Sequence, residues 1–350
     1  MAYWNSASRQ PYAPNAYSRG SSVVGAHEGN VCSLEFARRG YTRRKYRMLL
    51  AHDLTGRSEI AFVRAARLTI EREGDLTILH VINSELPAAL IEARRAHARS
   101  YIETEVRRWI GRYKLSYRID VGIGDPAVAI AARAQAHDVN LVVTGRHRRR
   151  PFADMFIAGT VERLLQQMQQ PVLVVGNSNQ SPYRRVLIPI DFTDASTETI
   201  QFATGFLPEA SLHLLHTYKK PFQDYVASPS LTFGRGERGK FSRPIGEQRK
   251  HALSRLIDAI ELGERRPLLT IANGDALALV KKELARQKTD LLVVGNHARS
   301  RMDHAPVGSQ AEAVLRSSPC DILVLSVHDP RVAAKTAPGW LGTGSQCKDP

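Results

Sequence analysis

The stretch LLVVGNHA (residues 291–298), followed by GS (308–309) and DILVL (321–325), decides the fold of this chain. An apolar run that ends at a glycine predicts a buried strand of a parallel sheet, and the Gly-Ser pair predicts the start of a helix. The free N–H groups at a helix start bind anions readily. The pattern therefore predicts strand, glycine loop, helix and strand, with a phosphate cradle at the loop.

A near-copy of this stretch occurs earlier in the chain, as LVVTGRHR (141–148), AGT (158–160) and PVLVV (171–175). Gly145 and Gly295 are 150 residues apart, and so are Val175 and Leu325. A repeat at one fixed spacing indicates an internal duplication. The length of 350 residues suits two domains of ordinary size.

Composition narrows the class of protein. No apolar run approaches the roughly 18 residues of a membrane span, and the polar start lacks the apolar stretch of a secretory signal, so we expect a cytoplasmic protein. Cys32, Cys320 and Cys347 form no C-x-x-C pair, which favours reduced thiols over disulfides or a zinc site. The net charge of +15 is concentrated in residues 1–47, 146–150 and 218–250.

Strands and helices are expected to alternate in both halves. Expected strands of the first half are 48–52, 76–82, 117–121, 141–144 and 172–175, with helices at 57–72, about 86–110 and after Gly124-Asp125-Pro126. Those of the second half are 186–190, 212–216, 268–271, 291–294 and 322–325, with a helix after Gly274-Asp275. Such alternation predicts right-handed crossovers and a parallel sheet with both faces covered.

The predicted domains follow from this order. Residues 1–43 are interpreted as a disordered basic arm, 44–177 as the first domain, 178–183 as a polar linker, 184–328 as the second domain and 329–350 as a tail. The halves differ in length between their second and third strands, where the second half carries a Gly/Arg-rich insertion at 219–246. We expect this insertion to be a surface loop.

The chain resembles the universal stress protein family over about residues 45–328. The resemblance rests on an aspartate after the first strand, on a Leu-His-Val-like end of the second, on Gly-Asp-Pro before the third helix, and on Gly-x2-Gly-x9-Gly-Ser/Thr after the fourth strand. It implies two tandem five-stranded parallel α/β sandwich domains of the adenine-nucleotide-hydrolase-like type, each with strand order 3-2-1-4-5. It also implies that the two fifth strands pair antiparallel within the chain, as an internal pseudo-dimer; a homodimer is the alternative. Some members bind ATP, and others, with a decayed glycine motif, do not.

The second half matches the ATP-binding pattern better. By the resemblance, Asp191 contacts the adenosine end of the nucleotide, Thr217 lines the adenine pocket, and Gly308 and Ser309 hold the phosphates. Ala298 stands where the motif has its middle glycine, a substitution that is costly if the backbone there needs a positive φ. The predicted nucleotide-binding residues are Pro189, Ile190, Asp191, Thr217, Val294, Gly295, Ala298, Gly308, Ser309 and Gln310.

The first half departs further from the motif. Arg148, Ala158 and Gly159 replace three phosphate-cradling positions, although Asp53, Val81 and Gly145 remain. We therefore expect no tight ATP site there, and interpret Asp53 and Asp125 as helix-cap and turn residues.

Some residues suggest functions other than nucleotide binding. His52, Asp53 and His80 form a candidate metal set, but His80 and His216 are repeat-equivalent, and a buried, hydrogen-bonded histidine is the plainer interpretation, so no metal site is predicted apart from Mg²⁺ on nucleotide phosphates. The run at 146–150 either grips phosphate or nucleic acid or is a solvated charged face. No Gly-x4-Gly-Lys-Ser/Thr loop or Gly-x-Ser-x-Gly elbow occurs, so we expect no dedicated catalyst and at most slow ATP hydrolysis.

The sequence thus predicts a cytoplasmic regulatory protein of the stress response that binds ATP or a related adenine nucleotide in its second domain. The first alternative is a tandem scaffold that binds no nucleotide and acts through a protein partner. The second is a stress factor that binds nucleic acid weakly through the basic arm and the 219–246 loop.

Overall fold

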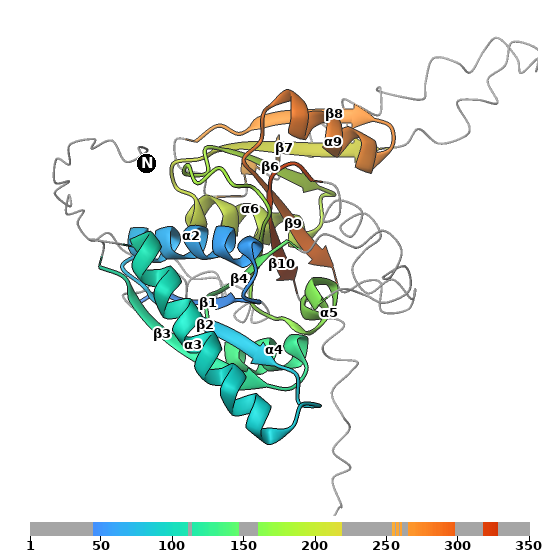
Figure 1. Cartoon of the computed structure of the whole chain (residues 1–350). Coiled ribbons are helices and arrows are strands. Elements are labelled where there is room, and N and C mark those ends of the chain that lie inside the picture. The colour runs from blue at the N-terminus through green and yellow to red at the C-terminus, as the bar shows by residue number, and fades with distance from the viewer. Residues whose placement is uncertain are drawn as a thin grey trace, which may run out of the picture.

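The computed structural model describes residues 45–110, 114–146, 160–218, 254–255, 257–258, 260, 265–297 and 318–327. Its elements alternate as the sequence predicts (Figure 1). The first half comprises β1 (Arg47–Ala51), α2 (Gly56–Glu71), β2 (Asp75–Ile82), α3 (Ala88–Ile110), β3 (Ser116–Ile123), α4 (Pro126–Ala136), β4 (Leu141–Gly145), α5 (Thr160–Gln167) and β5 (Val172–Val175). The second comprises β6 (Arg185–Ile190), α6 (Asp194–Phe206), β7 (Ser211–Tyr218), β8 (Leu268–Asn273), α9 (Ala276–Arg286), β9 (Leu291–His297) and β10 (Asp321–Val327).

The described strands form one ten-stranded sheet in the order β3-β2-β1-β4-β5-β10-β9-β6-β7-β8. The first five strands have the expected order 3-2-1-4-5, and the second five repeat it in the opposite direction across the sheet. Within each half every pairing is parallel. The predicted α/β class is therefore confirmed, and both fourth strands lie next to their first strands.

The two halves join through their fifth strands. β5 and β10 pair antiparallel, with Leu173 opposite Leu323. The antiparallel pairing implied by the family resemblance is thus confirmed inside a single chain. One consequence is that the carboxyl edge of the first half adjoins the amino ends of the strands of the second.

Cysteines at this junction should cross-link within one chain. In a background with the native cysteines replaced by serine, Leu173→Cys combined with Leu323→Cys should form an intramolecular disulfide, because directly opposed residues of antiparallel strands lie within disulfide reach. Non-reducing electrophoresis would show a monomer of altered mobility. A ladder of disulfide-linked dimers, or unreacted thiols, would count against the pairing.

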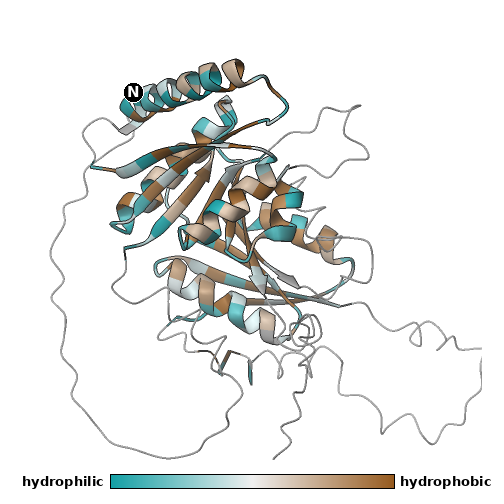
Figure 2. Ribbon diagram, turned by 90° about the horizontal axis from the view of Figure 1, so that it is seen from below, coloured by the Kyte–Doolittle hydropathy of each residue, from teal (hydrophilic) through white to brown (hydrophobic). Residues whose placement is uncertain are grey.

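Helices cover both faces of the sheet. One face packs on α2, α3 and α6 through residues such as Phe62, Ile102 and Ala203. The other packs on α4, α5 and α9 through residues such as Ile130, Leu164 and Val280. Central strands such as β5 are buried along their whole length, as expected of apolar runs in a parallel sheet. Figure 2 shows the apolar colour concentrated on these strands.

A glycine-aspartate turn starts the helix after the third strand in both halves. Gly124 and Gly274 have φ angles of 126° and 148°, a region open to glycine. Asp125 then accepts hydrogen bonds from the N–H groups of Ala127 (3.0 Å) and Val128 (3.2 Å), and Asp275 accepts one from Ala278 (3.0 Å). The helix-cap interpretation of this motif is confirmed.

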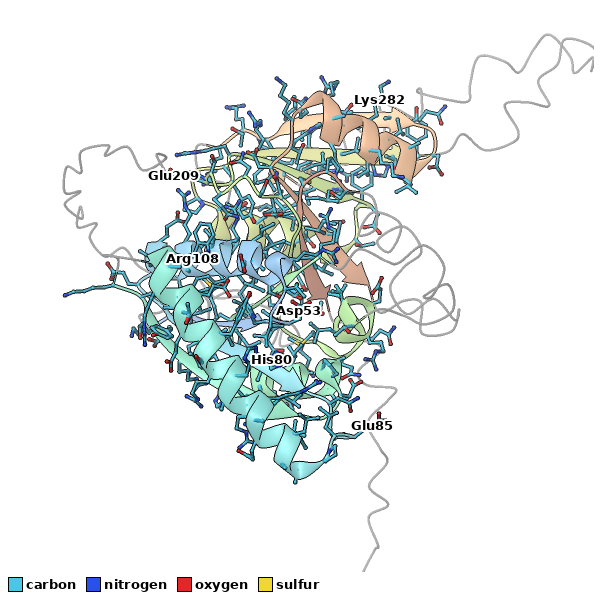
Figure 3. The ribbon with its side chains drawn as sticks, viewed as in Figure 1. Asp53, His80, Glu85, Arg108, Glu209 and Lys282 are labelled. Atoms are coloured by element: carbon cyan, nitrogen blue, oxygen red, sulfur yellow. The ribbon has the colours of Figure 1, made fainter. Side chains whose placement is uncertain are left out.

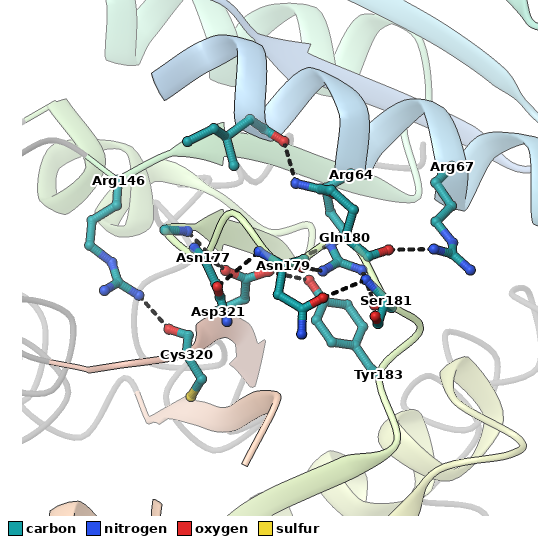
Figure 4. A network of polar contacts seen from close by, with 12 residues as sticks. Arg64, Arg67, Arg146, Asn177, Asn179, Gln180, Ser181, Tyr183, Cys320 and Asp321 are labelled. Atoms are coloured by element: carbon teal, nitrogen blue, oxygen red, sulfur yellow. Dashed lines mark hydrogen bonds and ion pairs between the residues drawn. The ribbon is translucent and has the colours of Figure 1, made fainter. Parts of the chain in front are cut away.

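A buried aspartate holds the linker at the domain junction. Asp321, 0 % exposed at the start of β10, accepts 2.9 Å hydrogen bonds through Oδ1 from the backbone N–H groups of Gly176 and Asn177. Its Oδ2 accepts a 2.7 Å hydrogen bond from the Tyr183 hydroxyl. Three groups that precede β6 in the chain are therefore attached to one carboxylate of the last strand (Figure 4).

Arg64 of α2 completes this junction network. Its guanidinium donates to the backbone oxygens of Ser181 (2.8 Å) and Asn179 (2.6 Å) and lies 4.2 Å from the centre of the Tyr183 ring. Its Nε is 3.6 Å from Oδ2 of Asp321, an electrostatic contact without hydrogen-bond geometry. Arg64 and Asp321, both buried, thus enclose the linker between α2 and β10.

Among the described residues, none of the helices has the length and apolarity needed to cross a membrane.

Candidate functional site

The first strand of each half ends in the same aspartate turn. In the first half, Oδ1 of Asp53 accepts hydrogen bonds from the backbone N–H (3.0 Å) and the hydroxyl (2.6 Å) of Thr55 and from the Ser58 hydroxyl. The Asp53 N–H donates in return to Ser58 Oγ at 3.0 Å. The turn thus has the pattern Asp-x-Thr-x-x-Ser and leads directly into α2.

The second half repeats this turn at the predicted nucleotide site. Asp191 accepts through Oδ1 from the N–H (3.2 Å) and hydroxyl (2.6 Å) of Thr193 and from the Ser196 hydroxyl (2.8 Å). The residue after the aspartate has a positive φ in both turns, 60° at Leu54 and 62° at Phe192. The Asp-x-Thr-x-x-Ser pattern thus forms the same hydrogen-bonded turn in both halves.

The Asp53 carboxylate is stabilised in its ionised form. Burial raises its pKa, but the hydrogen bonds from Ser58 and Thr55 together lower it by more. The pKa of Asp53 therefore lies below the ordinary value of an aspartate. A carboxylate at this strand end therefore stays charged at neutral pH.

The repeat-equivalent histidines have a structural role. Nδ1 of His80 lies 2.8 Å from the backbone oxygen of His52, and Nδ1 of His216 lies 2.9 Å from that of Ile190. Because a carbonyl only accepts, each Nδ1 carries the proton. Each second strand is thereby fastened to the end of its first strand, as the plainer interpretation predicts.

The imidazole of His52 lies apart from this pair and contacts α3. Its Nε2 is 2.9 Å from Oε2 of Glu105, in a contact without good hydrogen-bond angles, and its Nδ1 accepts from the Leu54 N–H at 3.1 Å. Among the described residues, no group of three metal-ligating side chains comes together.

A cavity of about 330 Å³ lies at the carboxyl ends of β1, β2 and β4 in the first half. Asp53, Val81 and Gly145, the first-half equivalents of predicted site residues, all line it, together with His80 (Figure 3). Gly145 makes a close approach here, because a Cβ on it would lie 3.1 Å from the backbone oxygen of Arg57. The sheet thus places its cavity at the switch in strand order, where open parallel sheets bind ligands.

Arg146 lines this cavity, but its guanidinium forms hydrogen bonds with the second half of the chain. Its guanidinium donates to the backbone oxygens of Ser318 and Cys320, and burial lowers its pKa while Asp321 opposes the shift. A Cβ on Gly176 would lie 2.6 Å from its guanidinium carbon, so a larger residue there would require the Arg146 side chain to shift. Neither sequence interpretation of the basic run, a free phosphate grip or a solvated face, holds for Arg146. The rest of that run lies outside the described residues.

The predicted second-half site is described in part. Pro189, Ile190 and Asp191 stand at the end of β6, Thr217 is near the end of β7, and Val294 and Gly295 are in β9. β6 pairs with both β7 and β9, which brings these strand ends to one edge. The remaining predicted residues lie outside the described part of the chain; they are Ala298, Gly308, Ser309 and Gln310. The first-half residues Arg148, Ala158 and Gly159 lie outside it as well.

The buried polar contacts of Asp321, Tyr183, Arg64 and Glu105 are not predicted by the sequence. The signal available for Asp321 is a charged residue directly before the apolar run ILVL, where the first repeat has Pro171. No local pattern marks Arg64 of α2 or Glu105 of α3, which are buried charged residues.

The fold and the paired strand-end turns define a class: tandem parallel α/β domains with the same aspartate turn at the end of each first strand, next to the switch between first and fourth strands. The model of the Universal stress protein family matches residues 46–176 and 182–326. The chain belongs to the universal stress protein family.

Individual relatives agree with this assignment. A universal stress protein of Methanocaldococcus jannaschii is 22% identical over 148 residues, which cover 42% of this chain and 85% of the relative. A universal stress protein A homolog of Pasteurella multocida is 30% identical over 109 residues, 29% of this chain and 77% of the relative.

Solved structures show the same fold. A universal stress protein from Archaeoglobus fulgidus has a TM-score of 0.60 at 17% identity, and the match covers 80% of this chain and 98% of that one. A putative universal stress protein from Pseudomonas aeruginosa has a TM-score of 0.55 at 19% identity, with 80% and 93% covered.

Proposed function

We propose that this chain is a regulatory protein of the stress response that binds ATP or a related adenine nucleotide in its second domain. The proposal treats residues 44–177 and 184–328 as two domains joined by the linker 178–183. The observation that supports it most is the Asp191 turn at the end of β6, the strand that pairs with β9, which carries Gly295. Hydrogen bonds from Thr193 and Ser196 hold this carboxylate in place.

The residues present fit such a ligand. Asp191 offers a carboxylate to ribose hydroxyls, and Thr217 and Ile190 border the same edge from β7 and β6. Gly308 and Ser309 would hold the phosphates through backbone N–H groups and a hydroxyl, since small residues at a helix start admit a close phosphate. Mg²⁺, where present, would bind the phosphates. A bound nucleotide would supply charge and hydrogen-bond acceptors at this edge, and no chemical step on it is proposed.

Mg-ATP should stabilise the protein against heat. At about 100 times its dissociation constant a ligand adds roughly 2.7 kcal/mol to the free energy of unfolding, which raises the melting temperature by several degrees. Differential scanning fluorimetry with and without Mg-ATP measures the shift. Gly308→Val should remove it, because the new side chain fills the phosphate position.

Ala158→Val is the matched control, because residue 158 is the first-domain equivalent of Gly308. It should keep the full shift. No shift in the wild-type protein at millimolar Mg-ATP would contradict the proposal and favour the scaffold function. A shift lost in Ala158→Val and kept in Gly308→Val would move the site to the first domain.

A further inference from the structure

The outer edge of β3 is an unpaired strand edge in the described part of the chain. Among the described strands, β3 and β8 are the two ends of the ten-stranded sheet, and Figure 1 shows them at opposite ends of the molecule. β3 pairs with β2 along its whole length, from Ser116 to Ile123. Its other edge therefore presents a row of backbone N–H and C=O groups that a further strand can pair with.

One hydrogen bond fixes which residues of β3 present these groups. Gly124, directly after β3, donates its N–H to the backbone oxygen of Ile82 in β2 at 2.8 Å. Backbone groups alternate in direction along a strand, so every second residue before Gly124 also faces β2. The residues between them, among which are Tyr117, Ile119 and Val121, direct their N–H and C=O groups outward. In an antiparallel pair, such residues exchange both hydrogen bonds with the residue opposite.

The sequence of β3 is self-complementary about Ile119. If two copies pair antiparallel with Ile119 opposite Ile119, Arg118 of each copy lies opposite Asp120 of the other, and Tyr117 lies opposite Val121. The arginine and aspartate then form the non-hydrogen-bonded type of pair, in which the side chains come closest. Opposite charges and aromatic–β-branched pairs both stabilise a sheet at directly opposed positions. A register centred on Arg118 or on Asp120 would place like charges opposite each other.

The charged side chains lie together on one face of the sheet. Residues in register on parallel strands point to the same face, so Arg118 lies on the face of Thr77, to which its Nε donates at 2.8 Å. Asp120 lies on this face too, with Oδ2 3.3 Å from Nε of Arg133 and the side chain 26% exposed. Because a carboxylate accepts several hydrogen bonds, this contact leaves room for a second guanidinium. Arg118 is exposed, so its terminal nitrogens can reach a carboxylate on a neighbouring copy.

The apolar side chains lie on the opposite face. Tyr117 is in register with Leu76 and Ile119 with Ile78, both core residues of the face that α3 covers. Tyr117 is nevertheless 42% exposed, because it stands on the last strand of the sheet. Pairing with a second copy would place Val121 beside its ring. Both faces of β3 thus suit the same register.

The other end of the sheet lacks this complementarity. The repeat equivalents of Arg118 and Asp120, 150 residues later, are Leu268 and Thr270 of β8. Charges on edge strands commonly prevent pairing, but charges of one sign suffice for that purpose. An arginine and an aspartate two positions apart instead attract a second copy in one register. A single self-complementary edge closes the assembly at two copies.

We propose that this chain forms a homodimer in which the β3 strands of two copies pair antiparallel about Ile119 and join both sheets into one. The ion pairs between Arg118 and Asp120, one on each side of the twofold axis, select the register. This dimer is separate from the pairing of β5 and β10 inside the chain. It also does not depend on nucleotide binding by the second domain.

Charge reversal in the full chain tests the proposal. Arg118→Asp leaves only acidic residues at the two paired positions, and Asp120→Arg leaves only basic ones. Each variant should raise the dissociation constant of the homodimer at least about tenfold, because repulsion replaces attraction on both sides of the axis. An equal mixture of the two variants should form a heterodimer, because every acidic position then meets a basic one. Sedimentation equilibrium over a range of chain concentrations measures all three.

The matched controls reverse an exposed ion pair of the second domain. Arg184→Asp and Glu209→Arg change side chains that are 57% and 78% exposed, far along the sheet from β3, and should leave the homodimer unchanged. Circular dichroism checks that every variant is folded, and heterodimer formation shows it independently.

Four results would each overturn the proposal. The wild-type chain could stay monomeric up to near-millimolar concentration, or it could form assemblies larger than a dimer. A homodimer that survives both Arg118→Asp and Asp120→Arg would use another surface. Monomers that fail to associate when the two variants are mixed would show that these charges do not oppose each other.

Discussion

Asp321→Ala should lower the free energy of unfolding by about 3–5 kcal/mol, the range for breaking a buried ion pair from one side. The Asp321 side chain is fully buried and accepts three hydrogen bonds, from two backbone N–H groups and the Tyr183 hydroxyl. Its removal leaves these donors and the Arg64 guanidinium, 3.6 Å away, without their buried acceptor. Urea denaturation followed by circular dichroism measures the loss.

Two further variants make this measurement specific. Asp321→Asn keeps an acceptor for the backbone N–H groups and should cost less than Asp321→Ala. Glu209→Ala removes a carboxylate that is 78% exposed and pairs with Arg184 at the surface, and should change the free energy of unfolding by less than about 0.5 kcal/mol. Equal losses in Asp321→Ala and Glu209→Ala would contradict the importance of the junction network.

The Asp321 network exists on one side of the junction, although β5 and β10 pair with approximate twofold symmetry. The first repeat has Pro171 where the second has Asp321. Other junction contacts use equivalent acceptors in both halves: Arg146 donates to the Ser318 oxygen, and Ser326 donates at 2.7 Å to the oxygen of Met168, the repeat equivalent of Ser318. The asymmetric carboxylate therefore serves the linker, which occurs once in the chain.

The strands and their order could be predicted because the physics behind them is local and repeated. Buried parallel strands are short apolar runs, and the fixed spacing between Gly145 and Gly295 aligns the two halves. The turns at Gly124 and Gly274 were also predictable from local sequence, because glycine permits the positive φ of the turn and the following aspartate caps the helix. The nucleotide site itself remains a prediction at Gly308 and Ser309, which lie outside the described residues.

The contacts at the junction could not be predicted, because they join residues far apart in sequence. Arg64 meets the linker more than a hundred positions later, and Arg146 meets Cys320 after 174. In the sequence Arg146 belongs to a charged run, and its neighbours give no sign that Gly176 leaves room for its guanidinium. The first-domain cavity was likewise not predicted. Arg148, Ala158 and Gly159 stand in place of the phosphate-binding residues of the motif, which argues against phosphate binding but not against a cavity.

Tyr183→Phe should lower the free energy of unfolding by about 1.5–3 kcal/mol at neutral pH, because the Tyr183 hydroxyl donates to a charged carboxylate in a buried site. Tyr117→Phe, at a tyrosine that is 42% exposed on β3, is the matched control and should have little effect. Denaturation at pH 7 compares the two. A loss that is no larger in Tyr183→Phe than in Tyr117→Phe would contradict the predicted strength of this hydrogen bond.

The same variant should reveal a pH dependence above the ordinary tyrosine pKa. Burial, followed by the negative charge of Asp321, raises the pKa of Tyr183 well above 10.0. Below pH 10 the tyrosine is neutral in both the folded and the unfolded chain, so its stabilisation is fully present. Above pH 10 the unfolded chain loses the proton first, and the stabilisation declines as the pH rises towards the folded-state pKa. The stability difference between the wild-type protein and Tyr183→Phe should therefore be constant from pH 7 to 9 and shrink above pH 10; a difference that stays constant through pH 11 would show that Tyr183 titrates alike in both states.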